Sequence, residues 1–152
     1  MSQDQTENGT DHSHRKWLLP LWRDLKKPIL CVDFDGCISN YKHPWRGVAE
    51  LTGDSPIPGA FDFLEKAIKK FTVLIFSSRC NAMEGIAAMQ GWMLSNGLKK
   101  EVLDELYFQP GKPSAFMIID DRARQFTGDW SEFDPDEMLK FEPWYYEESR
   151  KE

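Results

Sequence analysis

The sequence predicts an α/β fold, a three-layer sandwich in which helices cover a central, mainly parallel sheet. Three short and almost wholly apolar runs support this class, namely PILCVDF, FTVLIF and AFMIID. Such runs are typical of strands that are buried on both faces of a parallel sheet. Between them lie stretches with apolar side chains at helical spacing, and strands that alternate with helices indicate parallel pairing.

Each element follows from its local pattern. Residues 28–34 and 71–76 are predicted strands, residues 106–109 a shorter one, and residues 115–120 a further buried strand that ends in Asp120 and Asp121. Residues 36–57 are rich in Gly, Pro and polar side chains and predict a loop. Pro58 then leads into an amphipathic helix, and a second helix over residues 83–98 is expected to end near Gly97.

The length of 152 residues is that of one domain. Residues 1–14 contain a single apolar side chain, at Met1, so we expect a disordered tail. Residues 15–152 are expected to form one domain, with its core over residues 28–128 and an acidic, aromatic extension over residues 129–152. The apolar spacing of residues 17–25 predicts a short helix that docks on this domain.

Charge and composition narrow the classes of partner. The net charge of −6 and the isoelectric point near 5.1 disfavour nucleic acid as a partner, although a local basic patch leaves it possible. No apolar run approaches the roughly 20 residues that span a bilayer, so no membrane association is expected. Three cysteines without close metal-ligand spacing, and no secretory signal, predict a cytoplasmic protein.

Reactive side chains follow three of the predicted strands. These are Asp33 with Asp35, Ser77 with Arg79, and Asp120 with Asp121. Ligands of an open α/β sheet collect at the carboxyl ends of its strands, so one pocket is expected to gather all three pairs. Side chains one residue apart in extended chain point the same way, which lets Asp33 and Asp35 share a space. Converging carboxylates repel one another, and their oxygens suit Mg²⁺.

Magnesium at such a site indicates phosphate chemistry. One carboxylate can attack phosphorus while a neighbour exchanges protons with the leaving group and with water, and Asp33 and Asp35 suit these two tasks. Ser77 and Lys112 can offer a hydroxyl group and a cation to the phosphoryl charge. The remaining candidates for substrate contacts are Ser78, which is also an alternative to Ser77, and Arg46, Arg79 and Arg122. For Arg79 and Arg122, pairing with the surplus acidic groups is an equally open role.

The four elements together resemble the motifs of the haloacid dehalogenase (HAD) superfamily of phosphotransferases. They are DFDG at residues 33–36, the strand ending in Ser77, Lys112 in GKPSA, and the strand ending in Asp120-Asp121. The resemblance implies a Rossmann-like fold, with Asp33 as nucleophile and Asp35 as general acid and base. It assigns Ser77 to phosphate binding and Lys112 to stabilising the nucleophile and the phosphate.

The same resemblance implies a Mg²⁺ site. Its ligands would be Asp33, the main-chain carbonyl of Asp35, and Asp120, with Asp121 as a ligand or as a partner of one. The stretch KPSAFMIIDDRARQF is similar to a group of small bacterial and phage hydrolases that carry KPxA followed by IDDRA. That motif leaves the substrate open.

Two features depart from the superfamily pattern. Cys37 stands where Thr or Val is usual, and it is a possible oxidation site beside the pocket. The intervals after the first two strands are too short for a large cap domain, so we expect a capless or minimally capped protein. Such an open site accepts a bulky substrate, or it is closed by a second subunit or by the chain's own tails. The local candidate for a lid is the loop NYKHPWRG, with His43, Trp45 and Arg46.

Three functions follow as hypotheses. The first is a Mg²⁺-dependent phosphatase of small phosphorylated metabolites or nucleotides, acting through an aspartyl-phosphate on Asp33, which leaves transfer to water or to another acceptor open. The second is a phosphatase of nucleic-acid ends, because SSR followed downstream by DDR resembles the phosphatase domain of phage polynucleotide kinase. The third is a non-catalytic binding protein that retains the fold.

Overall fold

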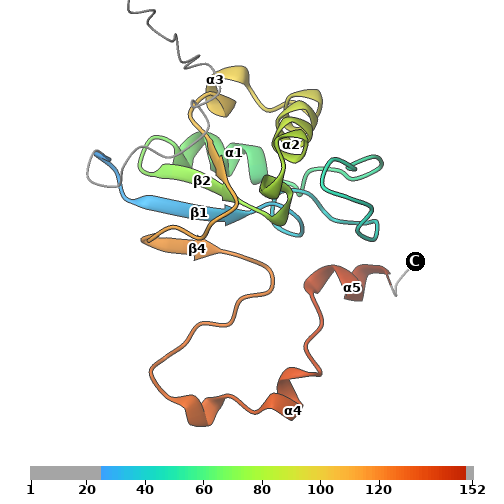
Figure 1. Ribbon diagram of the computed structural model, residues 1–152, viewed down its shortest axis with the longest axis vertical. Helices are drawn as coiled ribbons and strands as arrows, with labels where there is room; N and C mark the ends of the chain where they lie inside the picture. The colour runs from blue at the N-terminus through green and yellow to red at the C-terminus, as the bar shows by residue number, and fades with distance from the viewer. Residues whose placement is uncertain (1–24, 150–152) are drawn as a thin grey trace, which may run out of the picture.

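The computed structural model describes residues 25–149, so the expected disordered tail and nearly all of the expected docking helix lie outside the described residues. Its strands are β1 (Ile29–Asp33), β2 (Thr72–Phe76), β3 (Tyr107–Gln109) and β4 (Met117–Ile119). Its helices are α1 (Ala60–Ala67), α2 (Met83–Ser95), α3 (Lys100–Leu103), α4 (Pro135–Met138) and α5 (Trp144–Ser149), with 3-10 turns η3 (Ser78–Asn81) and η4 (Trp130–Glu132). The four predicted strands and both predicted helices are present (Figure 1).

The four strands form one parallel sheet in the order β3-β2-β1-β4, which confirms the α/β class. Val32 in β1 pairs with Ile75 on one side and with Ile119 on the other. The chain moves outward from β1 to β3 and then returns to the opposite side of β1. The strand order therefore reverses between β1 and β4, and ligands of open α/β sheets bind at such a point.

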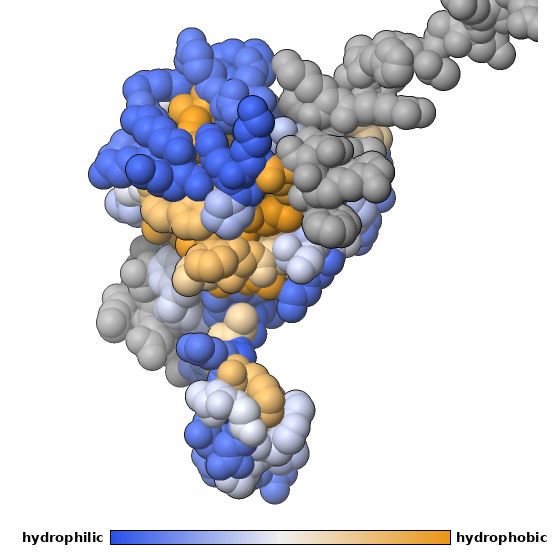
Figure 2. Space-filling model, turned by 90° about the vertical axis from the view of Figure 1, so that its left-hand side faces the viewer, coloured by the Kyte–Doolittle hydropathy of each residue, from blue (hydrophilic) through white to orange (hydrophobic). Residues whose placement is uncertain are grey.

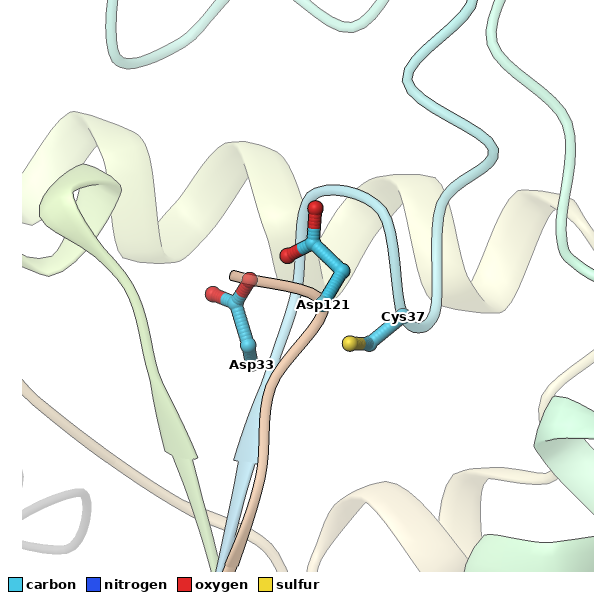
Figure 3. Close-up of side chains that lie close together, drawn as sticks. All are labelled: Asp33, Cys37 and Asp121. Atoms are coloured by element: carbon cyan, nitrogen blue, oxygen red, sulfur yellow. The ribbon is translucent and has the colours of Figure 1, made fainter. Parts of the chain in front are cut away.

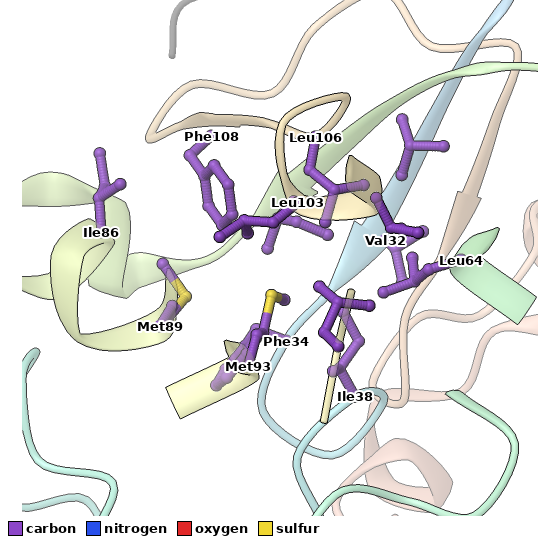
Figure 4. Packing of buried hydrophobic residues seen from close by; sticks show 14 of the residues in the cluster. Val32, Phe34, Ile38, Leu64, Ile86, Met89, Met93, Leu103, Leu106 and Phe108 are labelled. Carbon is purple, nitrogen blue, oxygen red and sulfur yellow. The ribbon is translucent and has the colours of Figure 1, made fainter. Parts of the chain in front are cut away.

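The main hydrophobic core lies between one face of the sheet and helices α1, α2 and α3. Strand side chains alternate between the two faces, so Leu30 and Val32 enter this core while Ile29 and Cys31 face the other way. Figure 4 shows Val32 of β1 near Leu64 of α1, with Met89 and Met93 of α2 in the same cluster. This core fixes the position of β1, and with it the place where Asp33 leaves the sheet.

The opposite face carries a much smaller cluster, whose buried members are Ile29, Cys31 and Leu74. Within residues 25–149, no helix contributes a side chain to this cluster. The described residues therefore form two layers, a sheet and one layer of helices, and they do not supply the third layer that the sequence predicts.

Strand β4 corrects one prediction. The sequence predicts a strand buried on both faces, but Phe116, Met117 and Ile119 are 70%, 54% and 36% exposed. The physical reason is that β4 contributes no residue to the main core, in contrast to Phe108 of β3 at the other edge of the sheet, so the faces of β4 are poorly covered. Phe116 instead packs near Phe71, with ring centroids 6.3 Å apart. Figure 2 shows an apolar band on this side of the molecule, above the small lobe at the bottom of the view.

The segment after β4 leaves the sheet and later returns to it (Figure 1). Its outer part holds η4 and α4, where Phe126, Trp130 and Phe133 lie with ring centroids 4.6–5.7 Å apart. Helix α5 then comes back to the carboxyl end of β1. None of the helices formed by residues 25–149 has the length and apolar character needed to cross a bilayer.

Candidate active site

The loop that follows β1 turns sharply at Gly36. The carbonyl of Phe34 accepts hydrogen bonds from the amides of Ile38 and Ser39, both at 2.9 Å. Gly36 has a φ of +87°, and a Cβ there would lie 2.6 Å from Oδ2 of Asp121. Glycine is therefore required both for the backbone conformation and for the close approach of Asp121.

Asp33 and Asp121 meet at this turn, together with Cys37. One ligand atom from each side chain lies within 4.8 Å of the other two, and Figure 3 shows the three side chains close together. The side chain of Asp121 is 2% exposed, and neither of its carboxylate oxygens has a hydrogen-bond partner. Nε of Arg122 lies 3.7 Å from Oδ2, which is a long ion-pair distance.

The electrostatics of this cluster favour a bound cation. Burial, and after it the neighbouring carboxyl of Asp121, raises the pKa of Asp33 well above its usual range. Burial and the nearby carboxylates, Asp33 first, raise the pKa of the Cys37 thiol to about 12. Buried carboxylate oxygens without partners are costly on their own. They fit a hard divalent cation such as Mg²⁺, which prefers oxygen ligands.

Asp35 lies beside this cluster and is held by Arg79. Nε of Arg79 donates to Oδ1 and Oδ2 of Asp35 at 3.1 and 2.9 Å, and a terminal nitrogen donates to Oδ1 at 2.9 Å. Oδ2 therefore accepts fewer hydrogen bonds than Oδ1. Burial raises the pKa of Asp35, although the hydrogen bonds and the charge of Arg79 act in the opposite direction.

Arg79 also anchors the loop above the site. It is 1% exposed, and its other terminal nitrogen donates to the carbonyls of Gly47, Val48 and Glu50 at 3.0–3.1 Å. Its guanidinium lies 4.8 Å from the centre of the Trp45 ring. Of the two roles open for Arg79, the structure shows pairing with an acidic group, since its donors are used by Asp35 and the loop.

A pocket of about 230 Å³ opens above these groups. Its lining is Asp33, Asp35, Tyr41, Trp45, Ser77, Ser78, Asp121, Arg122 and Tyr145. Ser77 caps the start of η3, and its hydroxyl oxygen accepts from the amide of Arg79 at 3.2 Å. An acceptor hydroxyl still has a proton to donate, so Ser77 can donate a hydrogen bond into the pocket.

Besides Arg79 and Cys37, which are described above, four further residues from the sequence analysis do not line this pocket. Asp120 accepts from the amide of Arg122 at 2.7 Å, so Asp121 rather than Asp120 joins Asp33. Arg46 donates to the carbonyl of Thr52 at 2.7 Å. Nδ1 of His43 lies 3.0 Å from Oδ1 of Asp54 in the same loop.

Lys112 is the fourth of these residues that do not line the pocket. Its side chain is exposed, and it is absent from the pocket lining. Its charge does reach the sheet beneath the site, because it lowers the pKa of Cys31, which burial raises more strongly to about 11. Cys31 and Asp33 lie on the same face of β1, because one residue, Val32, separates them in the strand.

Helix α5 forms a wall of the pocket; the sequence analysis named the chain's own tails among the possible closures but assigned no residue of α5 to it. The indole nitrogen of Trp144 donates to the carbonyl of Gly36 at 2.8 Å. The hydroxyl of Tyr145 accepts from Arg122, and its ring meets the ring of Tyr41 edge to face, with centroids 5.6 Å apart. The aromatic residues of the extension were the only sequence signal, and they do not specify where they dock.

The pocket thus combines converging carboxylates, hydroxyl donors and one lining arginine at the carboxyl edge of a parallel sheet. This set can bind a cation and an anionic group side by side. Comparison of the chain with models of protein families, with curated proteins and with solved structures gives no match. The groups in the pocket are therefore the basis for assigning its chemistry.

Proposed function

We propose that the protein is a Mg²⁺-dependent phosphatase of the HAD type, which hydrolyses a phosphomonoester through an aspartyl-phosphate on Asp33. One observation carries the proposal. Asp33 lies beside the buried Asp121 carboxylate, which has no hydrogen-bond partner, at the point where the strand order reverses. A cation is the partner that this geometry lacks, and the adjoining hydroxyl groups and arginine suit a phosphate.

The architecture supports the same proposal. The expected Rossmann-like HAD fold requires the strand that ends in Asp33 and the strand that ends in Asp120-Asp121 to present their carboxyl ends to one site. These strands are neighbours and parallel, with β2 and its Ser77 on the other side of β1. A short loop and α5 stand in place of a large cap, which supports a minimally capped protein.

The metal site would be formed by Asp33, Asp121 and the main-chain carbonyl of Asp35. Asp120 lies close enough for its charge to contribute to raising the pKa of Asp33, so it is a further acidic group of the same site. When bound, Mg²⁺ would supply positive charge to the phosphate oxygens and offset the repulsion between the carboxylates.

The remaining steps belong to the side chains. A carboxylate oxygen of Asp33 attacks phosphorus, the ester bond breaks, and Asp35 donates a proton to the leaving oxygen. Asp35 then takes a proton from the water that hydrolyses the aspartyl-phosphate. The raised pKa of Asp35 helps it to hold the proton it must first donate, and Arg79 fixes its orientation through Oδ1 while Oδ2 has the larger free capacity.

The phosphoryl group would be held by Ser77 and by a cation. Arg122 lines the pocket, so it is the cationic side chain that is placed to bind the phosphoryl group. The family resemblance assigns this phosphate-binding role to Lys112, but Lys112 is exposed and does not line the pocket. We propose that Lys112 influences the site through its positive charge, which reaches Cys31 in the strand that carries Asp33.

The test is hydrolysis of a broad panel of phosphoesters with Mg²⁺ or with EDTA, for the wild type and Asp33→Asn. We expect metal-dependent turnover that Asp33→Asn abolishes while its circular dichroism spectrum is unchanged. Glu105→Gln is the matched control, because Glu105 is exposed and lies outside the pocket. Turnover that persists in Asp33→Asn or in EDTA would reject the mechanism, and no turnover by the wild type would favour the non-catalytic alternative.

A second observation favours the nucleic-acid-end hypothesis as a narrower alternative. A concavity of about 380 Å³ adjoins the pocket and shares Arg122 with it. Arg124 and Lys140 also line it, together with Glu137 and the apolar Met138 and Phe141. Such a surface suits a substrate with a further anionic group, so the panel includes a 3′-phosphorylated oligonucleotide beside mononucleotides. Turnover of mononucleotides alone would remove this alternative.

A further inference from the structure

The cluster at the end of β1 contains a sulfur atom that the proposed phosphatase chemistry does not use. Cys37 follows Gly36 in the sharp turn, and its Sγ lies within 4.8 Å of an oxygen of Asp33 and an oxygen of Asp121 (Figure 3). Asp33 ends β1, Cys37 lies in the turn that follows it, and Asp121 lies two residues after the end of β4. Because β1 and β4 pair directly, the sheet brings these three segments together.

Asp121 supplies an independent reason to expect a ligand there. Its side chain is almost fully buried, and both of its oxygens lack hydrogen-bond partners. Its one charged neighbour of opposite sign in the described structure is Arg122, at 3.7 Å. Tetrahedral Zn²⁺, with bonds of about 2.0–2.3 Å, holds its ligand atoms about 3.3–3.8 Å apart. A contraction of about 1–1.5 Å from the 4.8 Å limit would suffice.

The donor set is selective by its chemistry. Mg²⁺ is a hard cation and takes oxygen ligands, so the sulfur adds nothing to its binding. Zn²⁺ and Co²⁺ accept thiolate together with carboxylate, so for them the sulfur is a third ligand. A Thr or Val at position 37 would provide no such ligand.

We propose that Asp33, Cys37 and Asp121 form a binding site for a thiophilic divalent cation, with Zn²⁺ as the representative ion and water in the fourth position. On binding, the S–H bond of Cys37 breaks, its proton passes to solvent, and a metal–sulfur bond forms. No oxidant or other reactant is needed.

The site has a regulatory consequence, which rests on the proposed function. A cation held by Cys37 engages the Asp33 carboxylate that is proposed to attack phosphorus. Zn²⁺ therefore inhibits turnover at this site, and the inhibition depends on the sulfur. The binding itself does not depend on any catalytic activity of the protein.

The test uses Co²⁺ as a spectroscopic probe on the reduced full-length protein without a histidine tag. We expect the near-ultraviolet charge-transfer band of a thiolate–Co²⁺ bond in the wild type, its loss in Cys37→Ser, and its displacement by Zn²⁺. Cys31→Ala and Cys80→Ala are matched controls that keep the band, because neither sulfur belongs to the cluster. Histidine ligands elsewhere do not produce this band.

Two further measurements keep the proposal falsifiable. If Cys37→Ser does not fold, Cys37→Thr replaces it, and Asp121→Asn is expected to weaken Co²⁺ binding by at least about tenfold. A folded wild type without the band, or a band that persists in the Cys37 variant, overturns the proposal. Absence of phosphatase turnover leaves the band unaffected, so the two proposals fail separately. If the protein is active, Zn²⁺ should inhibit the wild type at least about tenfold more strongly than the Cys37 variant.

Discussion

The buried carboxylate of Asp121 lowers the stability of the metal-free protein, although it is proposed to bind a cation. It is buried, it lacks hydrogen bonds, and it faces Asp33, so it destabilises the protein when no cation is present. We expect Asp121→Asn to raise the free energy of unfolding of the EDTA-treated protein at neutral pH by roughly 1–2 kcal/mol. If the wild type binds Mg²⁺ as proposed, Mg²⁺ should raise its melting temperature, and Asp121→Asn should lose this increase.

Denaturant and thermal unfolding, each with and without Mg²⁺, measure both effects. Glu105→Gln serves as control, since an exposed carboxylate should change the free energy of unfolding by no more than about 0.5 kcal/mol. A metal-free Asp121→Asn protein that is less stable than the wild type would contradict the assignment of a cation to this carboxylate.

Arg79 differs from Asp121, because all three nitrogens of its guanidinium group donate hydrogen bonds. Its removal would leave the Asp35 carboxylate and the carbonyls of the loop over residues 47–50 without their donor. We expect Arg79→Met to lower the free energy of unfolding by roughly 3–5 kcal/mol, as for other broken buried pairs. Arg79→Lys should recover only part of this loss, since an ammonium group cannot reproduce the fork.

Chemical denaturation provides the measurement for the Arg79 variants. Arg46→Met is the comparison, because Arg46 lies on the same loop with its side chain exposed and should cost no more than about 1 kcal/mol. Equal losses from the two arginines would show that Arg79 does not have the structural role described here.

Among the elements, α2 offers a matched pair of glycines. A Cβ on Gly85 would overlap the carbonyl oxygen of Arg79, whereas a Cβ on Gly91 would have open space around it. We expect Gly91→Ala to raise the free energy of unfolding by about 0.5–1 kcal/mol, because alanine favours the helix. Gly85→Ala should lower it by at least about 1 kcal/mol, since the helix must move away from η3. Urea unfolding of both variants tests this, and similar stabilities would exclude a close contact between α2 and η3.

The apolar runs and the strand ends were sufficient to predict the four strands, the parallel sheet and the meeting of Asp33 with the Asp120-Asp121 pair. The burial of β4 was wrong because the apolar run describes the strand but not what covers it. The family resemblance placed Asp120 ahead of Asp121 as the ligand beside Asp33, whereas the structure brings Asp121 to Asp33. Adjacent residues point to different sides, and which one faces Asp33 depends on the last turn of the chain after β4.

The docking of α5 was beyond prediction for a different reason. Periodicity reports on neighbours along the chain, whereas the Trp144 side chain meets a carbonyl 108 residues away. Arg79 illustrates the same difficulty, since its partners Asp35 and Val48 lie 44 and 31 residues distant. Long-range polar contacts of this kind leave no repeating pattern in the sequence.

At the scale of the whole molecule, the C-terminal segment and the sheet contribute differently. Among residues 25–149, the main core contains none beyond Phe108, while α5 supplies a wall of the pocket. We expect a chain that ends at residue 143 to retain its circular dichroism spectrum and a cooperative unfolding transition. Its turnover of small phosphoesters should fall by at least about tenfold, because Tyr145 no longer positions Arg122.

Kinetics and thermal unfolding of the shortened chain, beside Trp144→Phe, separate the loss of the wall from the loss of one hydrogen bond. The substitution should cost about 0.5–1.5 kcal/mol and affect turnover less than the deletion does. Full activity of the shortened chain would show that α5 does not complete the pocket.

The bond between Trp144 and Gly36 also joins two parts of the chain that lie 108 residues apart in the sequence. The entropy cost of closing such a loop grows only slowly with its length, by about 0.6 kcal/mol for each doubling. Contacts between residues so distant in the sequence nevertheless form slowly, because the chain between them must be ordered first. The four strands pair without any residue of α5, so we expect the sheet to form first during refolding and the wall of the pocket to form last.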